Sequence, residues 1–183
     1  MTTLTRLLCL VPLMSLAACS GTLPPVRSVA HVDLDRFMGD WFVIASKPTF
    51  IEQDAYNAVE SYARAGYRQI ATTFRFNKGA FDGPLKVYQP TGYVTDDPSN
   101  AIWGMQFIWP IKADYRVMYL SEDYSRTVIG RNKRDYVWIM ARTPVIAEAD
   151  YQTLVELIAD QGYDTSKIRR VPQRHMQTGD SRP

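Results

Sequence analysis

The sequence has few of the residues on which most enzyme and metal sites depend. Its 183 residues include two cysteines, Cys9 and Cys19, and two histidines, His31 and His175. Neither histidine has the spacing of a catalytic triad or a metal site. The sequence also has no glycine-rich phosphate loop and no Gly-x-Ser-x-Gly nucleophile elbow. We therefore predict no enzyme activity, no metal site and no cofactor.

An excess of charge of one sign is missing as well. The chain carries 21 basic and 19 acidic residues. A nucleic-acid-binding protein needs concentrated positive charge to displace counterions, so nucleic acid is not expected as a partner. The apolar run from Leu7 to Leu16 is shorter than the roughly 20 residues that a membrane-spanning helix needs.

The first residues instead have the layout of a secretory signal. A positive charge at Arg6 precedes the apolar run, and small residues follow it. The sequence Leu16-Ala17-Ala18-Cys19 resembles the bacterial lipobox, in which the cysteine is acylated and becomes the first residue of the mature protein. Several acyl chains hold a protein on a bilayer, because each buried methylene adds about 0.8 kcal/mol. We expect residues 1–18 to be a lipoprotein signal peptide and Cys19 to be lipidated.

Processing at Cys19 has two further consequences. Cys9 leaves with the signal peptide and Cys19 carries lipid, so the mature chain has no disulfide and depends on its own packing. Ser20 follows the cysteine, which by analogy with enterobacterial sorting favours the outer membrane, with the periplasmic face expected. Residues 19–30, which include two adjacent prolines, are predicted to form the lipidated N-terminus and an extended tether.

Beyond the tether, eight segments rich in aromatic and β-branched residues alternate with turn formers. Their connections are too short for parallel crossovers, so neighbouring strands should be antiparallel. Eight such strands remove their exposed edges by closing on themselves around side chains or one small ligand. We predict an all-β fold, an eight-stranded up-and-down antiparallel barrel. The segments are residues 41–46, 57–63, 67–76, 86–94, 101–107, 115–120, 127–131 and 136–142.

One later segment has helical rather than strand periodicity. Between residues 147 and 161 the apolar residues Tyr151, Leu154, Val155 and Ile158 recur at helical spacing. This pattern predicts one C-terminal α-helix packed outside the barrel. The barrel and its helix are expected to occupy residues 31–172, and residues 173–183 are polar and predicted to form a mobile tail.

Three local motifs occur in order along the predicted strands. They are Gly39-Asp40-Trp41 after a short helical turn at residues 34–38, the segment 120–124, and the segment 135–139 running into Arg142-Thr143-Pro144. This arrangement resembles the lipocalin family, and within it the bacterial outer-membrane lipoprotein lipocalins. Glu122 stands where the family has a threonine or a similar residue. The resemblance implies that Gly39, Trp41 and Arg142 close the narrow end of the barrel, with Arg142 stacked on Trp41 and hydrogen-bonded to the preceding turn.

The wall of the barrel interior is the predicted ligand site. Alternate residues of a strand point to opposite faces, so an inward Arg142 places other residues of the last strand along the wall. One face of the fifth strand offers more candidates, and the sixth strand offers Tyr119 or its neighbours, where the face is ambiguous. Aromatic and methionine side chains suit an extended apolar chain, such as a fatty acid or lysophospholipid, although they could also fill a solid core. The candidates are Tyr136, Trp138, Met140, Trp103, Met105, Phe107 and Tyr119.

A polar head group would need partners near the rim. Six basic residues near strand ends are candidates for contact with a carboxylate or phosphate: Lys47, Arg64, Arg68, Lys86, Lys112 and Arg116. Residues 50–56 are predicted to form an apolar lid over the mouth. The connection Trp109-Pro110-Ile111 is also unusually apolar. It could cap the pocket, touch a membrane, or contact a second copy in a homodimer.

These observations leave two functions open. The first is a membrane-anchored lipid-binding protein that binds, stores or transports fatty acids or lysophospholipids in the cell envelope. The second is a barrel scaffold that acts as an interaction protein without a small-molecule ligand, with the Trp109 connection as its contact surface.

Overall fold

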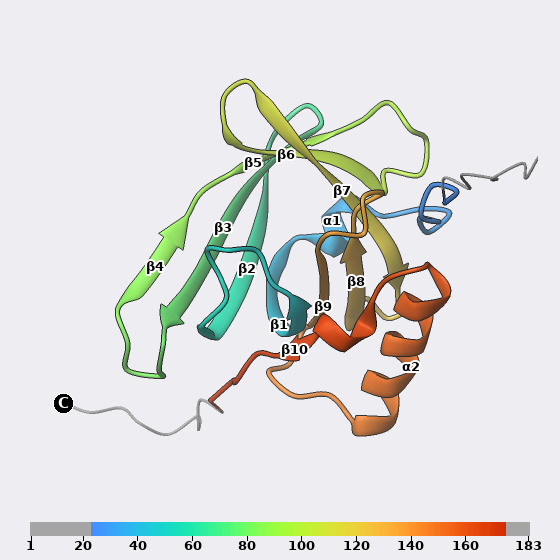
Figure 1. Cartoon of the computed structure of the whole chain (residues 1–183). Helices are drawn as coiled ribbons and strands as arrows, with labels where there is room; N and C mark the ends of the chain where they lie inside the picture. The colour runs from blue at the N-terminus through green and yellow to red at the C-terminus, as the bar shows by residue number, and fades with distance from the viewer. Residues whose placement is uncertain (1–22, 175–183) are drawn as a thin grey trace, which may run out of the picture.

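The computed structural model describes residues 23–174 and shows one antiparallel sheet curled into a barrel, with a helix on its outside (Figure 1). The helices are α1 (Leu34–Phe37), α2 (Glu148–Asp160) and the 3-10 helix η1 (Thr165–Lys167). The strands are β1 (Gly39–Lys47), β2 (Ala55–Gly66), β3 (Gln69–Lys78), β4 (Leu85–Tyr88), β5 (Thr91–Val94), β6 (Ile102–Ile108), β7 (Ile111–Leu120), β8 (Arg126–Gly130), β9 (Val137–Ala141) and β10 (Arg169–Arg170).

The barrel closes because β1 pairs with β2 on one side and with β9 on the other. Consecutive strands are antiparallel throughout, and β4 and β5 both pair with β3, so together they occupy one of eight barrel positions. The predicted eight-stranded up-and-down barrel is therefore confirmed. The two residues of β10 add a short pairing to β1 at Ala45 and Ser46.

The prediction of one continuous strand over residues 86–94 is wrong, because the chain breaks at Gln89 and Pro90. Proline has no backbone N–H to donate to a neighbouring strand, which favours a break at this point. After the break, β5 pairs with both β3 and β6. Before the break, β4 pairs with β3 alone, and the structure of residues 23–174 has no β4–β6 pairing, so the sheet is open on this side (Figure 1).

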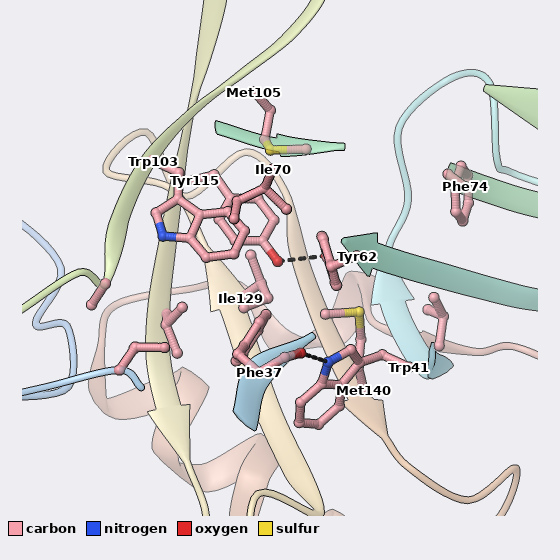
Figure 2. Close-up of a cluster of buried hydrophobic side chains, with 14 of the residues drawn as sticks. Phe37, Trp41, Tyr62, Ile70, Phe74, Trp103, Met105, Tyr115, Ile129 and Met140 are labelled. Atoms are coloured by element: carbon pink, nitrogen blue, oxygen red, sulfur yellow. Dashed lines mark hydrogen bonds between the residues drawn. The ribbon is translucent and has the colours of Figure 1, made fainter. Parts of the chain in front are cut away.

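Two apolar clusters make the core. One lies inside the barrel and contains Phe37, Trp41 and Trp103, which are almost completely buried (Figure 2). The other lies between the barrel wall and α2, where Leu154 and Ile158 pack with outward-facing strand residues. The predicted outer helix is thus confirmed. Burial at about 25 cal/mol per Å² of apolar surface makes both clusters stabilising.

Both ends of the described chain are bonded to the barrel. Near the N-terminus the Pro24 carbonyl accepts a hydrogen bond from Arg134 Nη2, and the Val29 amide donates to the Val117 carbonyl. Near the C-terminus Gln173 Nε2 donates to the carbonyls of Val43 and Ala58, both at 2.9 Å. The predicted tether is therefore docked from Pro24 onward, and the bonded chain extends past the predicted start of the tail at residue 173.

Candidate functional site

One end of the barrel is closed by a plug of aromatic side chains. Phe37, at the end of α1, enters the barrel, where its ring centroid lies 5.0 Å from that of Trp41 and 5.5 Å from those of Tyr62 and Trp103. Trp41 Nε1 donates to the Phe37 carbonyl at 2.9 Å (Figure 2). Asp33 caps α1 by accepting from the amides of residues 35 and 36. We call Phe37, Trp41, Tyr62 and Trp103 the floor.

Arg142 covers this floor from outside. Its guanidinium carbon lies 3.8 Å from the Trp41 ring centroid, within the range of a cation-π contact. Its Nη atoms donate to four carbonyls, those of Arg36, Phe37, Met38 and Asp40, at 2.8 to 3.1 Å. These contacts have the geometry that the family resemblance implied. That they stabilise the closed end remains a prediction.

Gly39 is required by the same arrangement. Its φ of +96° lies in a region that residues with a side chain rarely adopt, and an added Cβ would lie 3.3 Å from Arg142 Nη1. A glycine here therefore lets the chain turn from α1 into β1 directly beneath the guanidinium.

Above the floor the barrel contains a cavity of about 550 Å³. Four loops connect the strands at the other end of the barrel, residues 48–54, 79–84, 109–110 and 131–136, and we call this end the mouth. Loops 48–54 and 131–136 contribute residues to the cavity lining. The wall is mainly apolar and aromatic, with a few charged groups. The lining residues are Thr49, Phe50, Ile51, Glu52, Glu60, Phe74, Tyr88, Gln89, Pro90, Met105, Phe107, Ile108, Ala113, Asp114, Tyr115, Arg131, Tyr136 and Trp138.

Four of the seven predicted wall residues line this cavity. Met105 and Phe107 come from β6, Trp138 comes from β9, and Tyr136 precedes β9. The structure brings these four side chains together from separate strands, as the strand alternation predicted. Whether they contact a ligand stays a prediction.

Two other predicted wall residues lie lower, in the packed core. Trp103 stacks on Tyr115 with ring centroids 5.1 Å apart and donates from Nε1 to the Asn100 carbonyl at 2.7 Å. Met140 is fully buried in the same cluster (Figure 2). Both point inward as expected, but they fill the barrel below the cavity rather than line it.

Tyr119 is a correction, because its side chain lies on the outer face of the barrel. The pairing of β7 with β8 shifts register between Val117 and Tyr119, which makes Met118 an extra residue in the strand. Such a bulge reverses the alternation of faces beyond it. Val117 therefore packs inside the barrel, whereas Met118 and Tyr119 pack in the cluster beside α2.

The basic residues proposed for the rim do not reach the cavity. All six are described in the structure, and none is among its lining residues. Lys47 donates to the Arg134 carbonyl, Arg116 pairs with Asp114, and Arg64 pairs with Asp35 near the closed end. In the predicted lid, Phe50 and Ile51 do line the mouth, whereas Tyr56 packs against Phe81.

Three acidic side chains line the cavity without having been predicted from the sequence: Glu52, Glu60 and Asp114. Glu60 accepts a hydrogen bond from the Tyr62 hydroxyl, which lies 2.6 Å from that of Tyr115. Glu52, in the mouth loop, accepts from Trp138 Nε1 at 3.2 Å and from the Thr49 amide at 2.8 Å. Alternation along β2 could have found Glu60, because Ala58, Glu60 and Tyr62 share one face.

The surroundings of the Glu52 and Glu60 carboxyl groups disfavour their charged forms. Loss of bulk water raises the pKa of Glu60 to about 7, and the nearby charge of Glu52 adds to the shift. Burial also raises the pKa of Glu52, although its hydrogen bonds from Thr49 and Trp138 oppose this. The cavity therefore combines apolar walls with two carboxyl groups that titrate at higher pH than usual.

The described residues 23–174 contain no cluster of His, Cys, Asp and Glu suited to holding a metal ion. Within the same range no helix is long and apolar enough to cross a membrane. The lipidation predicted at Cys19 lies outside the described residues.

Comparison with known proteins identifies the family. A model described as a lipocalin-like domain matches residues 32–173. The chain belongs to the lipocalin family. Members of this family are typically binding and transport proteins for small hydrophobic ligands.

This lipocalin has relatives in several groups of organisms. It is 31% identical over 153 residues to temperature-induced lipocalin-1 of Arabidopsis thaliana, covering 79% of this chain and 81% of the relative. It is 29% identical over 161 residues to the outer membrane lipoprotein Blc of Citrobacter freundii, covering 85% and 89%. Among solved structures, insecticyanin of the tobacco hornworm Manduca sexta superposes with a TM-score of 0.66 at 16% identity, covering 85% and 88%. That structural likeness shows the fold alone.

Proposed function

We propose that this lipocalin binds the apolar chain of a fatty acid or lysophospholipid in its cavity. The observation that carries the proposal is the cavity of about 550 Å³, which is walled by aromatic and methionine side chains and open at one end. Its volume lies in the range of about 300 to 1,000 Å³ typical of small-molecule sites. The floor blocks the other end, so a chain would enter through the mouth or the open side between β4 and β6.

Membrane attachment through an acylated Cys19 is the second part of the proposal. The lipobox-like sequence supports it, as do relatives named outer membrane lipoprotein. Pro24 is bonded to Arg134 in the loop 131–136, which contributes Arg131 and Tyr136 to the cavity. Since an extended chain spans at most about 3.6 Å per residue, an acylated Cys19 would lie within roughly 18 Å of Pro24.

This attachment point favours a mouth that faces the bilayer. Apolar side chains project from the same end of the barrel, with Trp109 83% exposed and Phe50 82% exposed. Single exposed apolar residues are ordinary, but several around one opening are typical of an interaction site. A ligand could then pass between membrane and cavity without crossing water. We infer an outer-membrane location and a role in binding, storing or transporting lipid within the envelope.

The experiment uses residues 20–183 without acyl groups, a chain that contains every described element. Organic extracts of the purified protein are analysed by mass spectrometry, and a fluorescent fatty acid is titrated into the delipidated protein. We expect co-purified acyl lipid and saturable binding. Trp138→Ala and Met105→Arg should each weaken binding, because both side chains line the cavity: the first change removes apolar contact and the second introduces a charge. Tyr67→Ala, at an exposed position on the β2–β3 turn, is the control and should bind normally.

The alternative is an interaction protein without a small-molecule ligand. The exposed side chains of Ile108, Trp109 and Ile111 on the β6–β7 hairpin favour it, because a protein partner or a second copy could cover them. A folded barrel with no extractable lipid and no saturable binding would support this function. Sedimentation of the wild type and Trp109→Ser would then test for a homodimer.

A further inference from the structure

Only some of the charged groups in the cavity have a salt-bridge partner of opposite charge. Four charged side chains line it, namely Glu52, Glu60, Asp114 and Arg131. Asp114 pairs with Arg116 at 3.0 Å, and Arg131 pairs with Asp135 at 3.3 Å. Glu52 and Glu60 have no salt-bridge partner among residues 23–174. Neutral donors from tryptophan, tyrosine and the backbone are their partners instead.

Two separate elements bring these carboxyl groups to one cavity. Glu60 lies on β2, opposite Phe74 in register, just above the floor. Glu52 lies in the mouth loop against Trp138 and is almost completely buried. The two are near enough that the charge of Glu52 raises the pKa of Glu60. Both carboxyl groups line the same cavity, so a group bound near them would experience the negative charge of both.

We propose that the cavity contains a subsite for a cationic nitrogen, such as a protonated amine on an apolar body, between Glu60 and Glu52. This inference deepens the proposed function and rests on it, since it specifies the polar end of the ligand. A cation would relieve the repulsion between two poorly hydrated carboxylates. The aromatic side chains of Trp138, Tyr115 and Tyr88 also line the cavity, and aromatic rings attract cations.

The same charges disfavour a free carboxylate at this point. A fatty-acid anion near Glu60 would add a third negative charge where like charges raise one another's pKa. Its carboxylate would therefore remain toward the mouth, near Arg131. The subsite thus distinguishes among ligands that share one apolar chain, and predicts that an amine-bearing lipid is preferred over an unesterified fatty acid.

The first experiment compares three ligands with the same ten-carbon chain: decylammonium, decanol and decanoate. Each is titrated calorimetrically into residues 20–183 at pH 8, below its aggregation concentration. We expect decylammonium to bind more tightly than decanol, and decanol more tightly than decanoate. A difference of about tenfold between decylammonium and decanoate corresponds to about 1.4 kcal/mol. Equal or tighter binding of decanoate would overturn the proposal.

Substitutions locate the effect. Glu60→Gln and Glu52→Gln should each weaken decylammonium binding several-fold and leave decanol binding nearly unchanged. Glu122→Gln makes the same charge change in the exposed β7–β8 turn, away from the cavity, and should alter neither. If both cavity variants bound decylammonium as the wild type does, no such subsite would exist.

The pH dependence of the wild type gives a test that needs no variant. The preference for decylammonium over decanol should fall between pH 8 and pH 5.5, because protonation of Glu60 removes its charge. Other charged or titratable groups near Glu60 could also contribute to the pH dependence. Tyr62 donates a hydrogen bond to Glu60, and the lining groups are Glu52, Tyr88, Asp114, Tyr115, Arg131 and Tyr136. A preference that is constant over this range would contradict the role of Glu60.

The three titrations give different results if the cationic subsite is absent and if the cavity binds no lipid at all. If none of the three ligands binds, the proposed lipid-binding function itself fails. If all three bind with equal affinity, the cavity binds apolar chains and only the cationic subsite is refuted.

Discussion

Both ends of the barrel are rich in aromatic residues, but these residues are buried at one end and exposed at the other. At the closed end, Phe37, Trp41 and Trp103 pack against one another and are almost completely buried. At the mouth, Phe50 and Trp109 are more than 80% exposed around an opening. Aromatic residues therefore stabilise the fold at one end and leave surface for binding at the other. Substitutions at the two ends should separate stability from binding.

The largest expected effect is a loss of stability at the floor. Trp41→Ala should lower the free energy of unfolding by about 3 to 5 kcal/mol, because it leaves a cavity and breaks the bond to the Phe37 carbonyl. Trp138→Ala should cost less, because that side chain already borders open space in the ligand cavity. Urea denaturation of both variants measures the difference. Equal losses would mean that the upper barrel is as tightly packed as the floor.

A smaller loss is expected when the cover of the floor is removed. Arg142→Ala should lower the free energy of unfolding by about 2 to 3 kcal/mol, since four carbonyls each lose one hydrogen bond and Trp41 loses a stacked cation. Lys112→Ala is the matched control, because Lys112 Nζ lies 3.8 Å from the Tyr93 ring centroid on an exposed surface. It should cost less than about 0.5 kcal/mol. If both variants lost a similar free energy of unfolding, Arg142 would contribute no more to stability than an exposed cation-π contact.

These two ends also differ in how well the sequence predicts them. At the closed end, the contact between Trp41 and Arg142 could be expected because both belong to local motifs that resemble those of the family. Phe37 and Tyr62 carry no such motif, and Trp103 was expected in the ligand wall. The mouth was only partly predictable. Loop 48–54 folds so that Glu52 accepts a hydrogen bond from Trp138 on the neighbouring strand β9. These residues are 86 positions apart, and no local sequence pattern indicates the contact.

Errors within the strands have local physical causes. Alternation offered Tyr119 as a wall residue with its face ambiguous, and the extra residue Met118 places its side chain on the outer face. Pro90 divides a predicted strand in two, since it cannot donate a backbone hydrogen bond. Glu60 was not predicted because inward positions of a strand were expected to be apolar. It is an acid at an inward position between Ala58 and Tyr62.

The stability of the protein should depend on pH through Glu60, which lies where the cavity meets the floor. The pKa of Glu60 is raised from 4.5 to about 7, so the folded protein binds more protons than the unfolded chain between these values. Stability should therefore fall as pH rises from about 4.5 to 7, and then level off. The expected loss is on the order of 3 kcal/mol, since the shift is about 2.5 pKa units and one unit corresponds to about 1.4 kcal/mol. The raised pKa of Glu52 acts in the same direction.

Glu60→Gln isolates this contribution, because it keeps the shape of the side chain and removes its titration. Denaturation midpoints of both proteins at pH 5, 6, 7 and 8 give the comparison. The variant should lose less stability than the wild type as pH rises. If the stabilities of the two proteins changed with pH in the same way, Glu60 would have ordinary access to water. The part of the cavity next to the floor would then be more polar than its buried position suggests.

The smallest effect on stability is expected at the tip of the mouth, where the effect on membrane binding should be clearest. Trp109→Ser removes an exposed side chain and should change the free energy of unfolding by less than about 0.5 kcal/mol. If the mouth faces the bilayer, the same change should reduce the binding of residues 20–183 to phosphatidylethanolamine-containing vesicles several-fold, because Trp109 can no longer enter the interface. Tyr67→Ser alters an equally exposed aromatic residue at the closed end and should leave vesicle binding unchanged. If both variants lost vesicle binding equally, exposed aromatic residues would bind lipid regardless of their position. The side chains of the mouth would then not orient the barrel on the membrane, and only the lipid anchor could do so.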